Sequence, residues 1–219
     1  MHVIAVVGVG GRSGALDPLT PVVGVPMVVR SVRCLLASGL LARVLLLGAG
    51  DRREAFARAC ADLPVEVHDG SLRQALSTVG AHAGQRAEPA KGVGVGASAL
   101  LVHDAARPLA PSGLVHDVLA AIADGHRCAV PVLPLSDTVK VVDSEGLVRG
   151  SPDRASLRVV QSPRAFRIDP PTVSDLPADP LAVGRDTAAH TLPGHPLAFA
   201  ITGPWDLELA ELLVRGGET

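Results

Sequence analysis

An acid and an arginine stand three residues apart, directly after a short apolar run, in the segment Leu100–Pro108. An apolar run bounded by small residues and proline is typical of a buried strand. In open α/β sheets, ligands bind just beyond the carboxyl ends of such strands. A carboxylate there can hold a divalent cation and a guanidinium can hold a phosphate, so Asp104 and Arg107 are candidates for phosphate chemistry. The alternative is a buried salt bridge between them that fastens the strand end.

A second candidate is the glycine-rich segment Gly8–Gly14, which follows an apolar, β-branched run over His2–Val7. Where Cβ atoms are missing, backbone N–H groups can converge on an anion, and Arg12 can neutralise a phosphate held there. A dinucleotide fingerprint needs a glycine in place of Ser13 and an acid in place of Gly48, and the lysine of a Walker loop is absent. The loop therefore predicts a generic phosphate cradle rather than an NAD site, with an ordinary strand–helix turn as the alternative.

Length, charge and composition narrow the class of protein. We expect one domain over residues 1–219, because a chain of this length can bury a sizeable core. A net charge of −2 and 2% aromatic residues argue against nucleic-acid binding. Since no stretch resembles a secretory signal or a membrane span, we expect a cytoplasmic protein with no membrane partner. The three cysteines are expected to be reduced core residues, and the eight histidines have no metal-ligand spacing.

Apolar runs alternate with helical patterns along most of the chain. Strands are predicted over His2–Val7, Arg43–Leu47, Val65–His68, Ala99–Val102 and Arg127–Leu133, and helices over Met27–Ser38, Arg52–Ala61, Ser71–Val79 and from about Ser112. This alternation predicts an α/β fold with a Rossmann-like, doubly wound, mostly parallel sheet. A final strand is expected over Leu197–Thr202, and a last helix after Gly203-Pro204 with Trp205, Leu209, Leu212 and Leu213 on one face.

The regular alternation of predicted strands and helices ends after Leu133. Residues 136–143 alternate with period two, Glu145-Gly146 can turn, and Leu147–Arg149 can return. This pattern predicts a β-arm over about residues 136–152 that protrudes from the sheet. Because an isolated two-stranded arm is marginal in water, we expect it to pack on something, such as a second copy of the chain.

Four motifs stand in an order and at a spacing that resemble one family. They are Gly8-Val9-Gly10-Gly11-Arg12, Val102-His103-Asp104-Ala105-Ala106-Arg107-Pro108, Pro134-Leu135-Ser136-Asp137-Thr138-Val139-Lys140, and Arg154 with Gln161-Ser162-Pro163-Arg164-Ala165-Phe166. The chain resembles the 2-C-methyl-D-erythritol 4-phosphate cytidylyltransferases of non-mevalonate isoprenoid biosynthesis. The resemblance implies a homodimer of domains of the nucleotide-diphospho-sugar transferase type with a swapped β-arm. It also implies transfer of CMP from CTP to methylerythritol phosphate with Mg²⁺, for which Mn²⁺ can substitute, and release of pyrophosphate.

The resemblance also implies a role for each matching residue. Asp104 would lie near the metal and the reacting hydroxyl, and Arg12 would be a catalytic cation beside the triphosphate. The expected nucleotide-binding residues are Gly8, Gly10, Gly11 and Ser77. The expected contacts to methylerythritol phosphate are Arg107, Thr138 and Ser162, with Arg154 reaching it from the partner subunit.

Two departures from the family pattern remove cations. The family has one lysine where Leu19 stands and another where Ala200 stands. Because nucleotidyl transfer depends on positioning and on neutralising charge at the phosphorus oxygens, these losses predict impaired turnover. Arginine could substitute, and Arg53, Arg164 and Arg185 are the candidates.

A third departure and two other functions stay open at this point. Val6 and Val7 replace two alanines of the family and are expected to bring branched bulk toward the nucleotide. One alternative function is a catalytically impaired paralogue that binds a ligand or serves as a partner subunit. The other is a nucleotidyltransferase or glycosyltransferase-like enzyme with a different substrate.

Overall fold

The computed structural model describes residues 1–9, 16–69, 71–72, 74–76, 98–168 and 188–217. Its main sheet is formed by β1 (Val3–Gly8), β4 (Arg43–Leu47), β5 (Glu66–His68), β6 (Ser98–Asp104), β7 (Cys128–Pro134), β10 (Arg158–Val160), β11 (Arg164–Ile168) and β12 (His190–Pro193). The longer helices are α1 (Met27–Ala37), α2 (Arg53–Ala59), α4 (Gly113–Ala123) and α5 (Pro204–Arg215). Short elements are the strands β2 (Pro21–Val22) and β3 (Val25–Pro26) and the 3₁₀ helices η1 (Gly50–Arg52), η2 (Arg154–Ser156) and η5 (Pro196–Ala198).

The predicted mostly parallel sheet is confirmed in its central part. Within the described residues the strand order is β10-β7-β11-β6-β1-β4-β5, and β12 runs parallel beside β7. Strands β6, β1, β4 and β5 are mutually parallel, and all six residues of β1 are buried. A strand buried on both faces explains why β1, residues 44–47 of β4 and residues 99–102 of β6 are continuous apolar runs rather than alternating ones.

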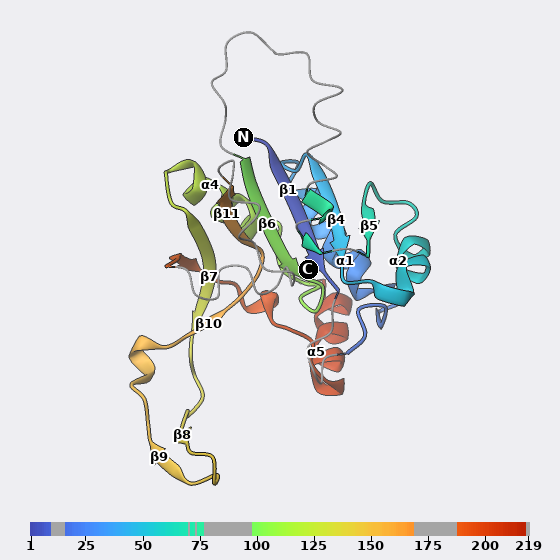
Figure 1. Ribbon diagram of the computed structural model, residues 1–219. Helices are drawn as coiled ribbons and strands as arrows, with labels where there is room; N and C mark the ends of the chain where they lie inside the picture. The colour runs from blue at the N-terminus through green and yellow to red at the C-terminus, as the bar shows by residue number, and fades with distance from the viewer. Residues whose placement is uncertain (10–15, 70, 73, 77–97, 169–187, 218–219) are drawn as a thin grey trace.

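Helices pack on the sheet through two separate apolar cores. Side chains of α1, α2 and α4 form one apolar core with Val7, Leu46 and Leu101 of the sheet. Figure 1 shows the arrangement of these helices and strands. The opposite face holds Val6 and Leu100 together with other apolar residues, including those of the short helical segment at 72 and 74–76. Helix α1 ends before Gly39, whose φ of +67° favours glycine and reverses the chain toward β4.

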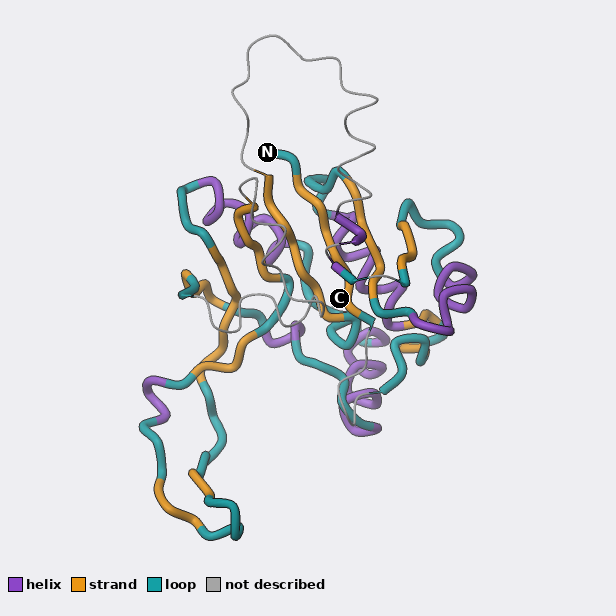
Figure 2. The backbone as a smooth tube through the Cα atoms, in the orientation of Figure 1, coloured by secondary structure: helices purple, strands orange, loops and turns teal. Residues whose placement is uncertain are grey.

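The β-arm is confirmed and extends away from the sheet (Figure 2). Its two strands, β8 (Val141–Val142) and β9 (Val148–Gly150), pair antiparallel across a turn in which the Gly146 N–H donates to the Asp143 carbonyl. The Asp143 carboxylate accepts hydrogen bonds from the Glu145 and Leu147 backbone N–H groups, 2.9 Å each. These bonds lower the pKa of Asp143, with the Arg149 guanidinium acting in the same direction.

One expectation for the C-terminal third of the chain is wrong and another is only partly confirmed. No strand forms over Leu197–Thr202, because η5 (Pro196–Ala198) takes up its first residues and the Ile201 N–H donates to the Ala106 carbonyl, in the loop after β6. Helix α5 forms as predicted, but it packs on the core through Leu207, Ala210 and Leu213. Of the four residues expected to share its apolar face, Leu213 packs there as predicted, whereas Trp205, Leu209 and Leu212 are exposed.

Two further features follow from the described residues. Cys60 and Cys128 are buried, Cys34 is partly buried, and all three are free thiols, as expected. In the same part of the chain, no helix combines the length and hydropathy that a membrane crossing requires.

Candidate active site

Asp104 and Gly8 lie side by side at the carboxyl edge of the sheet. They end the neighbouring parallel strands β6 and β1 and are directly opposite in register. The Ala105 N–H donates to the Gly8 carbonyl at 3.1 Å, and the Asp104 Oδ1 accepts a hydrogen bond from the Ala106 N–H at 3.0 Å. The aspartate is therefore held in one orientation, next to the first glycine of the predicted phosphate cradle.

Ser162 fastens the end of β6 from a distant part of the sequence. Its hydroxyl accepts a hydrogen bond from the Asp104 N–H at 3.1 Å, and its Oγ lies 3.2 Å from His103 Nδ1. Burial lowers the pKa of His103 to about 4, so this imidazole is neutral at neutral pH. Ser162 is itself buried. Both of these contacts position the strand that carries Asp104.

Replacing Ser162 with alanine is expected to lower the free energy of unfolding by about 2 kcal/mol, because the buried Asp104 N–H loses its acceptor. Urea denaturation followed by circular dichroism measures this change. The matched control is Ser144→Ala, which removes an exposed hydroxyl on the arm and should leave the midpoint unchanged. Equal midpoints for the two variants would contradict the role assigned to Ser162.

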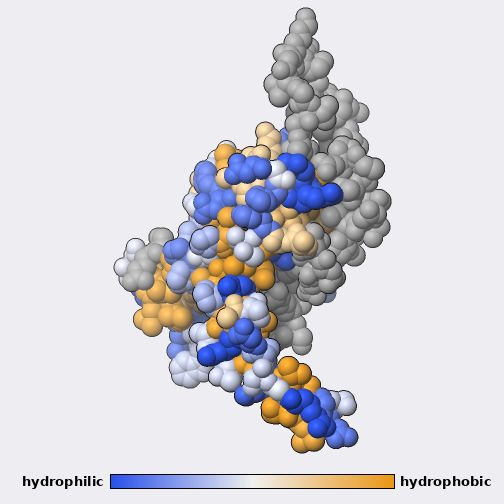
Figure 3. Space-filling model, turned by 90° about the vertical axis from the view of Figure 1, so that its left-hand side faces the viewer, coloured by the Kyte–Doolittle hydropathy of each residue, from blue (hydrophilic) through white to orange (hydrophobic). Residues whose placement is uncertain are grey.

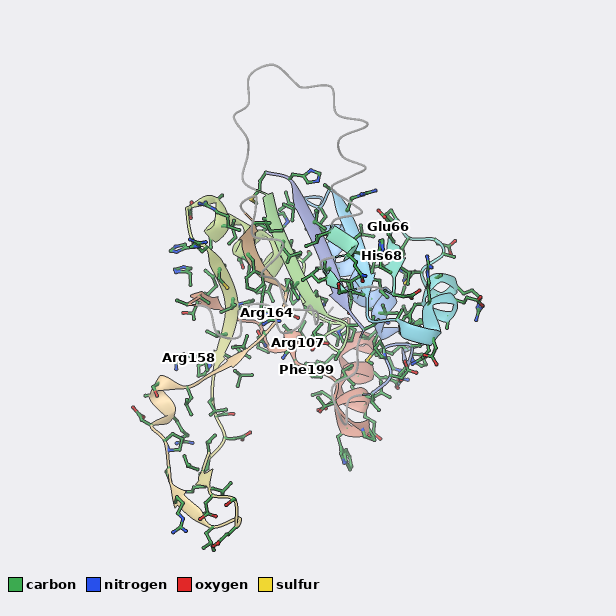
Figure 4. The ribbon with its side chains drawn as sticks, viewed as in Figure 1. Glu66, His68, Arg107, Arg158, Arg164 and Phe199 are labelled. Atoms are coloured by element: carbon green, nitrogen blue, oxygen red, sulfur yellow. The ribbon has the colours of Figure 1, made fainter. Side chains whose placement is uncertain are left out.

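Arg107 is buried below the same edge and bonds to the main chain. Its guanidinium donates to the carbonyls of Ala198 and Val160, which belong to two segments far apart in the sequence. In Figure 4 Arg107 and Phe199 lie together at this edge, as the bond to Ala198 requires. The bonds seen at this edge run from Arg107 to main-chain carbonyls and from the Ala106 N–H to Asp104, and none of them supports the salt-bridge alternative.

The remaining predicted substrate residues lie elsewhere in the chain. Thr138 and Arg154 are exposed on the arm, where the Arg154 Nη1 donates to the Ser136 carbonyl at 3.0 Å. Within one chain, the residues predicted to bind methylerythritol phosphate thus form two groups: Arg107 and Ser162 near Asp104, and Thr138 and Arg154 on the arm. The predicted roles of Gly10, Gly11, Arg12 and Ser77 lie outside the described residues.

Of the two positions without the family's lysines, the structure places one beside the framework of the site. Leu19 packs partly buried against the core, and its N–H donates to the Asp17 carboxylate. Ala200 precedes Ile201, whose N–H donates to the Ala106 carbonyl at 2.7 Å, two residues after Asp104. The residue at position 200 therefore lies beside the loop that carries Asp104 and Arg107.

The three arginines considered as substitutes have different surroundings. Arg53 is exposed and lies 3.6 Å from the Asp69 carboxylate in a surface ion pair. Arg164 is buried on β11, opposite Val102 of β6, and Arg185 lies outside the described residues.

Val6 and Val7 are fully buried, one in each core. The expectation that they bring bulk toward a nucleotide is wrong. Successive side chains of a strand point to opposite faces, and both faces of β1 are covered.

Sequence reasoning gave no role to Gln161, which the structure places beside this site. The Gln161 side chain is buried, donates to the His195 carbonyl and accepts from the His195 N–H, at 2.9 Å each. It thereby joins the loop before β11 to the segment before η5. The sequence feature that could have pointed to Gln161 is its place in the Gln161-Ser162-Pro163 motif.

Comparison with known proteins gives the same family throughout. The family model described as 2-C-methyl-D-erythritol 4-phosphate cytidylyltransferase (IspD) matches residues 1–175. The enzyme of that name from Nocardia farcinica is 41% identical over 216 residues, covering 94% of this chain and 90% of the relative. The one from Frankia casuarinae is 36% identical, covering 97% and 81%.

Solved structures agree on the fold. The 4-diphosphocytidyl-2C-methyl-D-erythritol synthase of Anaerococcus prevotii superposes with a TM-score of 0.70 at 18% identity, covering 98% of each chain. The cytidylyltransferase of Thermus thermophilus superposes with a TM-score of 0.60 at 26% identity, covering 98% of this chain and 100% of the other. This chain belongs to the 2-C-methyl-D-erythritol 4-phosphate cytidylyltransferase family.

Proposed function

We propose that this protein transfers CMP from CTP to 2-C-methyl-D-erythritol 4-phosphate and releases pyrophosphate. The observation that carries the proposal is the pairing of Gly8 with Asp104, which sets a fixed carboxylate beside the start of a glycine-rich loop in a member of this family. Neither the comparisons nor the described residues favour the two alternative functions that the sequence raised.

The reacting group of the substrate follows from the product. The related synthases are named for a diphosphocytidyl-methylerythritol, in which the sugar alcohol's own phosphate is joined to that of CMP. We therefore propose that a phosphate oxygen of methylerythritol phosphate attacks the α-phosphorus of CTP, instead of the hydroxyl that the sequence suggested. The new P–O bond forms as the bond to the β-phosphate breaks, and pyrophosphate leaves with that electron pair.

The donor set at this edge fits a magnesium ion that arrives with the triphosphate. Among the described residues, no three His, Cys, Asp or Glu side chains converge as a metal site, and Asp104 supplies one carboxylate. Mg²⁺ is commonly held by one or two carboxylates together with phosphate oxygens and water, and Mn²⁺ accepts the same ligands. When bound, the ion neutralises negative charge that develops on the phosphate oxygens. Asp104 would hold it at the edge of the sheet.

Pyrophosphate release tests the proposal. With CTP, methylerythritol phosphate and Mg²⁺, we expect continuous release that stops when either substrate is left out. No release at micromolar enzyme with Mg²⁺ or Mn²⁺ would reject the assigned activity. Because CTP is a cytosolic metabolite and the bacterial relatives are biosynthetic enzymes, we also propose that the protein works in the cytoplasm.

We further propose that two copies associate through their arms. Six large aliphatic side chains of the arm and of the adjoining strand β10 are exposed: Val141, Val142, Leu147, Val148, Val159 and Val160. Apolar side chains gather on the protruding end in Figure 3. Exposed apolar surface of this kind marks interaction sites, and a protruding arm can bring Thr138 and Arg154 to the strand end of a partner.

Replacing Val148 with aspartate is expected to raise the dissociation constant of the dimer by at least about tenfold, because it places an unpaired charge in the proposed interface. Light scattering after size-exclusion chromatography should give the native protein twice the chain mass of 22.4 kDa, and the variant a mass near that of one chain. Leu40→Asp, on an exposed site between α1 and β4, is the control and should remain dimeric. A monomeric native protein at micromolar concentration would contradict the proposal.

A further inference from the structure

A pocket of about 540 Å³ lies on the face of the molecule where α1, the start of α4 and η5 meet. Its polar wall includes Arg30, Arg33 and His195, and its apolar wall includes Cys34, Leu109 and Leu197. None of the residues that line it is acidic. A volume of this size suits a small organic molecule, and the absence of a carboxylate from the wall favours an anion.

The two arginines stand one turn apart on α1 without a carboxylate between them. Arg30 is fixed, because its Nε and Nη2 both donate to the Val22 carbonyl, at 3.1 and 2.9 Å. Arg33 is exposed and has no hydrogen-bond or ion-pair partner among the described residues. Burial and the charge of Arg33 lower the pKa of Arg30. An anion bound between the two guanidinium groups would relieve this repulsion and accept charge-assisted hydrogen bonds.

His195 adds a third nitrogen-bearing side chain to the lining of the pocket. Its Nδ1 accepts a hydrogen bond from the Leu197 N–H at 3.1 Å, so in the neutral ring the proton is on Nε2. Its backbone is held on both sides by the Gln161 side chain. The pocket is therefore bounded by three nitrogen-bearing side chains, of which Arg30 and His195 are fixed by bonds to the rest of the protein.

The rest of the wall suits an apolar body. The Cys34 thiol donates to the Ala110 carbonyl at 2.6 Å, and burial raises its pKa to about 11, so it is an un-ionised, weakly polar group. Leu109 and Leu197, which line the pocket, belong to a single apolar cluster. A ligand that fits both walls has a phosphate-type head and a short hydrocarbon body.

We propose that this pocket binds a small organic phosphate with an apolar body, at a site separate from those for CTP and methylerythritol phosphate. The pocket shares its wall with the candidate active site: Pro108 and Leu109 follow Arg107, and Leu197 precedes the Ala198 carbonyl that Arg107 contacts. Arg107 and Asp104 themselves do not line it. The pocket therefore adjoins the candidate active site without including Asp104 or Arg107.

Isothermal titration calorimetry with n-hexyl phosphate tests the proposal, with inorganic phosphate and 1-hexanol as probes of the head and the body alone. We expect hexyl phosphate to bind more tightly than either probe. Arg33→Ala should weaken its binding by about tenfold or more, the usual effect of losing a hydrogen bond to a charged group. Arg58→Ala removes the same charge from an exposed site on α2 and should leave the affinity unchanged. Saturating CTP and methylerythritol phosphate should not displace the ligand.

Three results would overturn the inference. The first is no binding of hexyl phosphate at millimolar concentration, or binding no tighter than that of inorganic phosphate. The second is equal weakening in the Arg33 and Arg58 variants, which would indicate a general effect of charge. The third is displacement by either substrate, which would assign the binding to the active site. These measurements do not depend on turnover, so they stand apart from the test of the proposed transferase activity.

Discussion

Replacing Asp104 with asparagine is expected to lower kcat for pyrophosphate release by about 100- to 1,000-fold, the usual effect of removing one preorganised charge-stabilising group. The asparagine Oδ1 can still accept the Ala106 N–H that Asp104 now accepts, so the loop should keep its shape. What is lost is the negative charge that would hold Mg²⁺ beside the triphosphate. A coupled assay for pyrophosphate, at saturating CTP and methylerythritol phosphate, measures the change.

The matched control is Asp117→Asn, which removes the same charge from an exposed site on α4. Its turnover should equal that of the native protein, and the thermal midpoints of both variants should lie close to the native value. If Asp104→Asn retained turnover within about threefold of native, less than 1 kcal/mol in activation free energy, Asp104 would not be the metal ligand proposed here.

Replacing Ala200 with lysine is expected to raise kcat by about tenfold or more, because it would restore the family's cation next to the proposed site of the reacting phosphates. The hydrogen bond from Ile201 to Ala106 places residue 200 next to the loop that carries Asp104 and Arg107. Since the loss of one such group typically costs about 100- to 1,000-fold, restoring it should recover part of that factor. Adding Leu19→Lys should give a further gain, and the two gains should not be additive, because both cations act on the same charge.

Ala123→Lys controls for this prediction, since it adds the same charge at an exposed site near the end of α4. Its turnover should not change. A folded Ala200→Lys variant with native or lower turnover would show that another group already neutralises this charge, or that position 200 does not face the substrate.

The central strands could be predicted because each is a short apolar run that ends in glycine or a polar residue. Buried on both faces, β1, β4 and β6 have no need for polar side chains, and their composition shows it. The antiparallel strands β10 and β11 escaped prediction. Val159 and Val160 are exposed, and β11 carries two arginines, so neither strand has the pattern of a core element.

The expected strand at Leu197–Thr202 illustrates a different failure. Its apolar residues are those of a strand, but Leu197 and Phe199 pack irregularly with α5 and the β2–β3 region instead of pairing in the sheet. Local pattern shows which residues are buried. It does not show whether their backbone groups form hydrogen bonds in a sheet or with a loop, as the Ile201 N–H does with the Ala106 carbonyl.

In the site, Asp104 and Gly8 could be placed from sequence, because the carboxyl ends of adjacent parallel strands meet at one edge. The contacts that hold the site in place could not be predicted. Ser162 is 58 residues from Asp104, and Arg107 bonds to carbonyls 53 and 91 residues away. Those contacts depend on β11 entering the sheet between β6 and β7, which no local pattern indicated.

A crystal structure of the native protein with CTP and Mg²⁺ bound would show whether this edge of the sheet is the nucleotide site. We expect the triphosphate to lie along the backbone N–H groups of the loop after Gly8, with the metal between Asp104 and the phosphate oxygens. CTP bound elsewhere, or side chains that occupy this loop while Asp104 contacts neither metal nor phosphate, would contradict it.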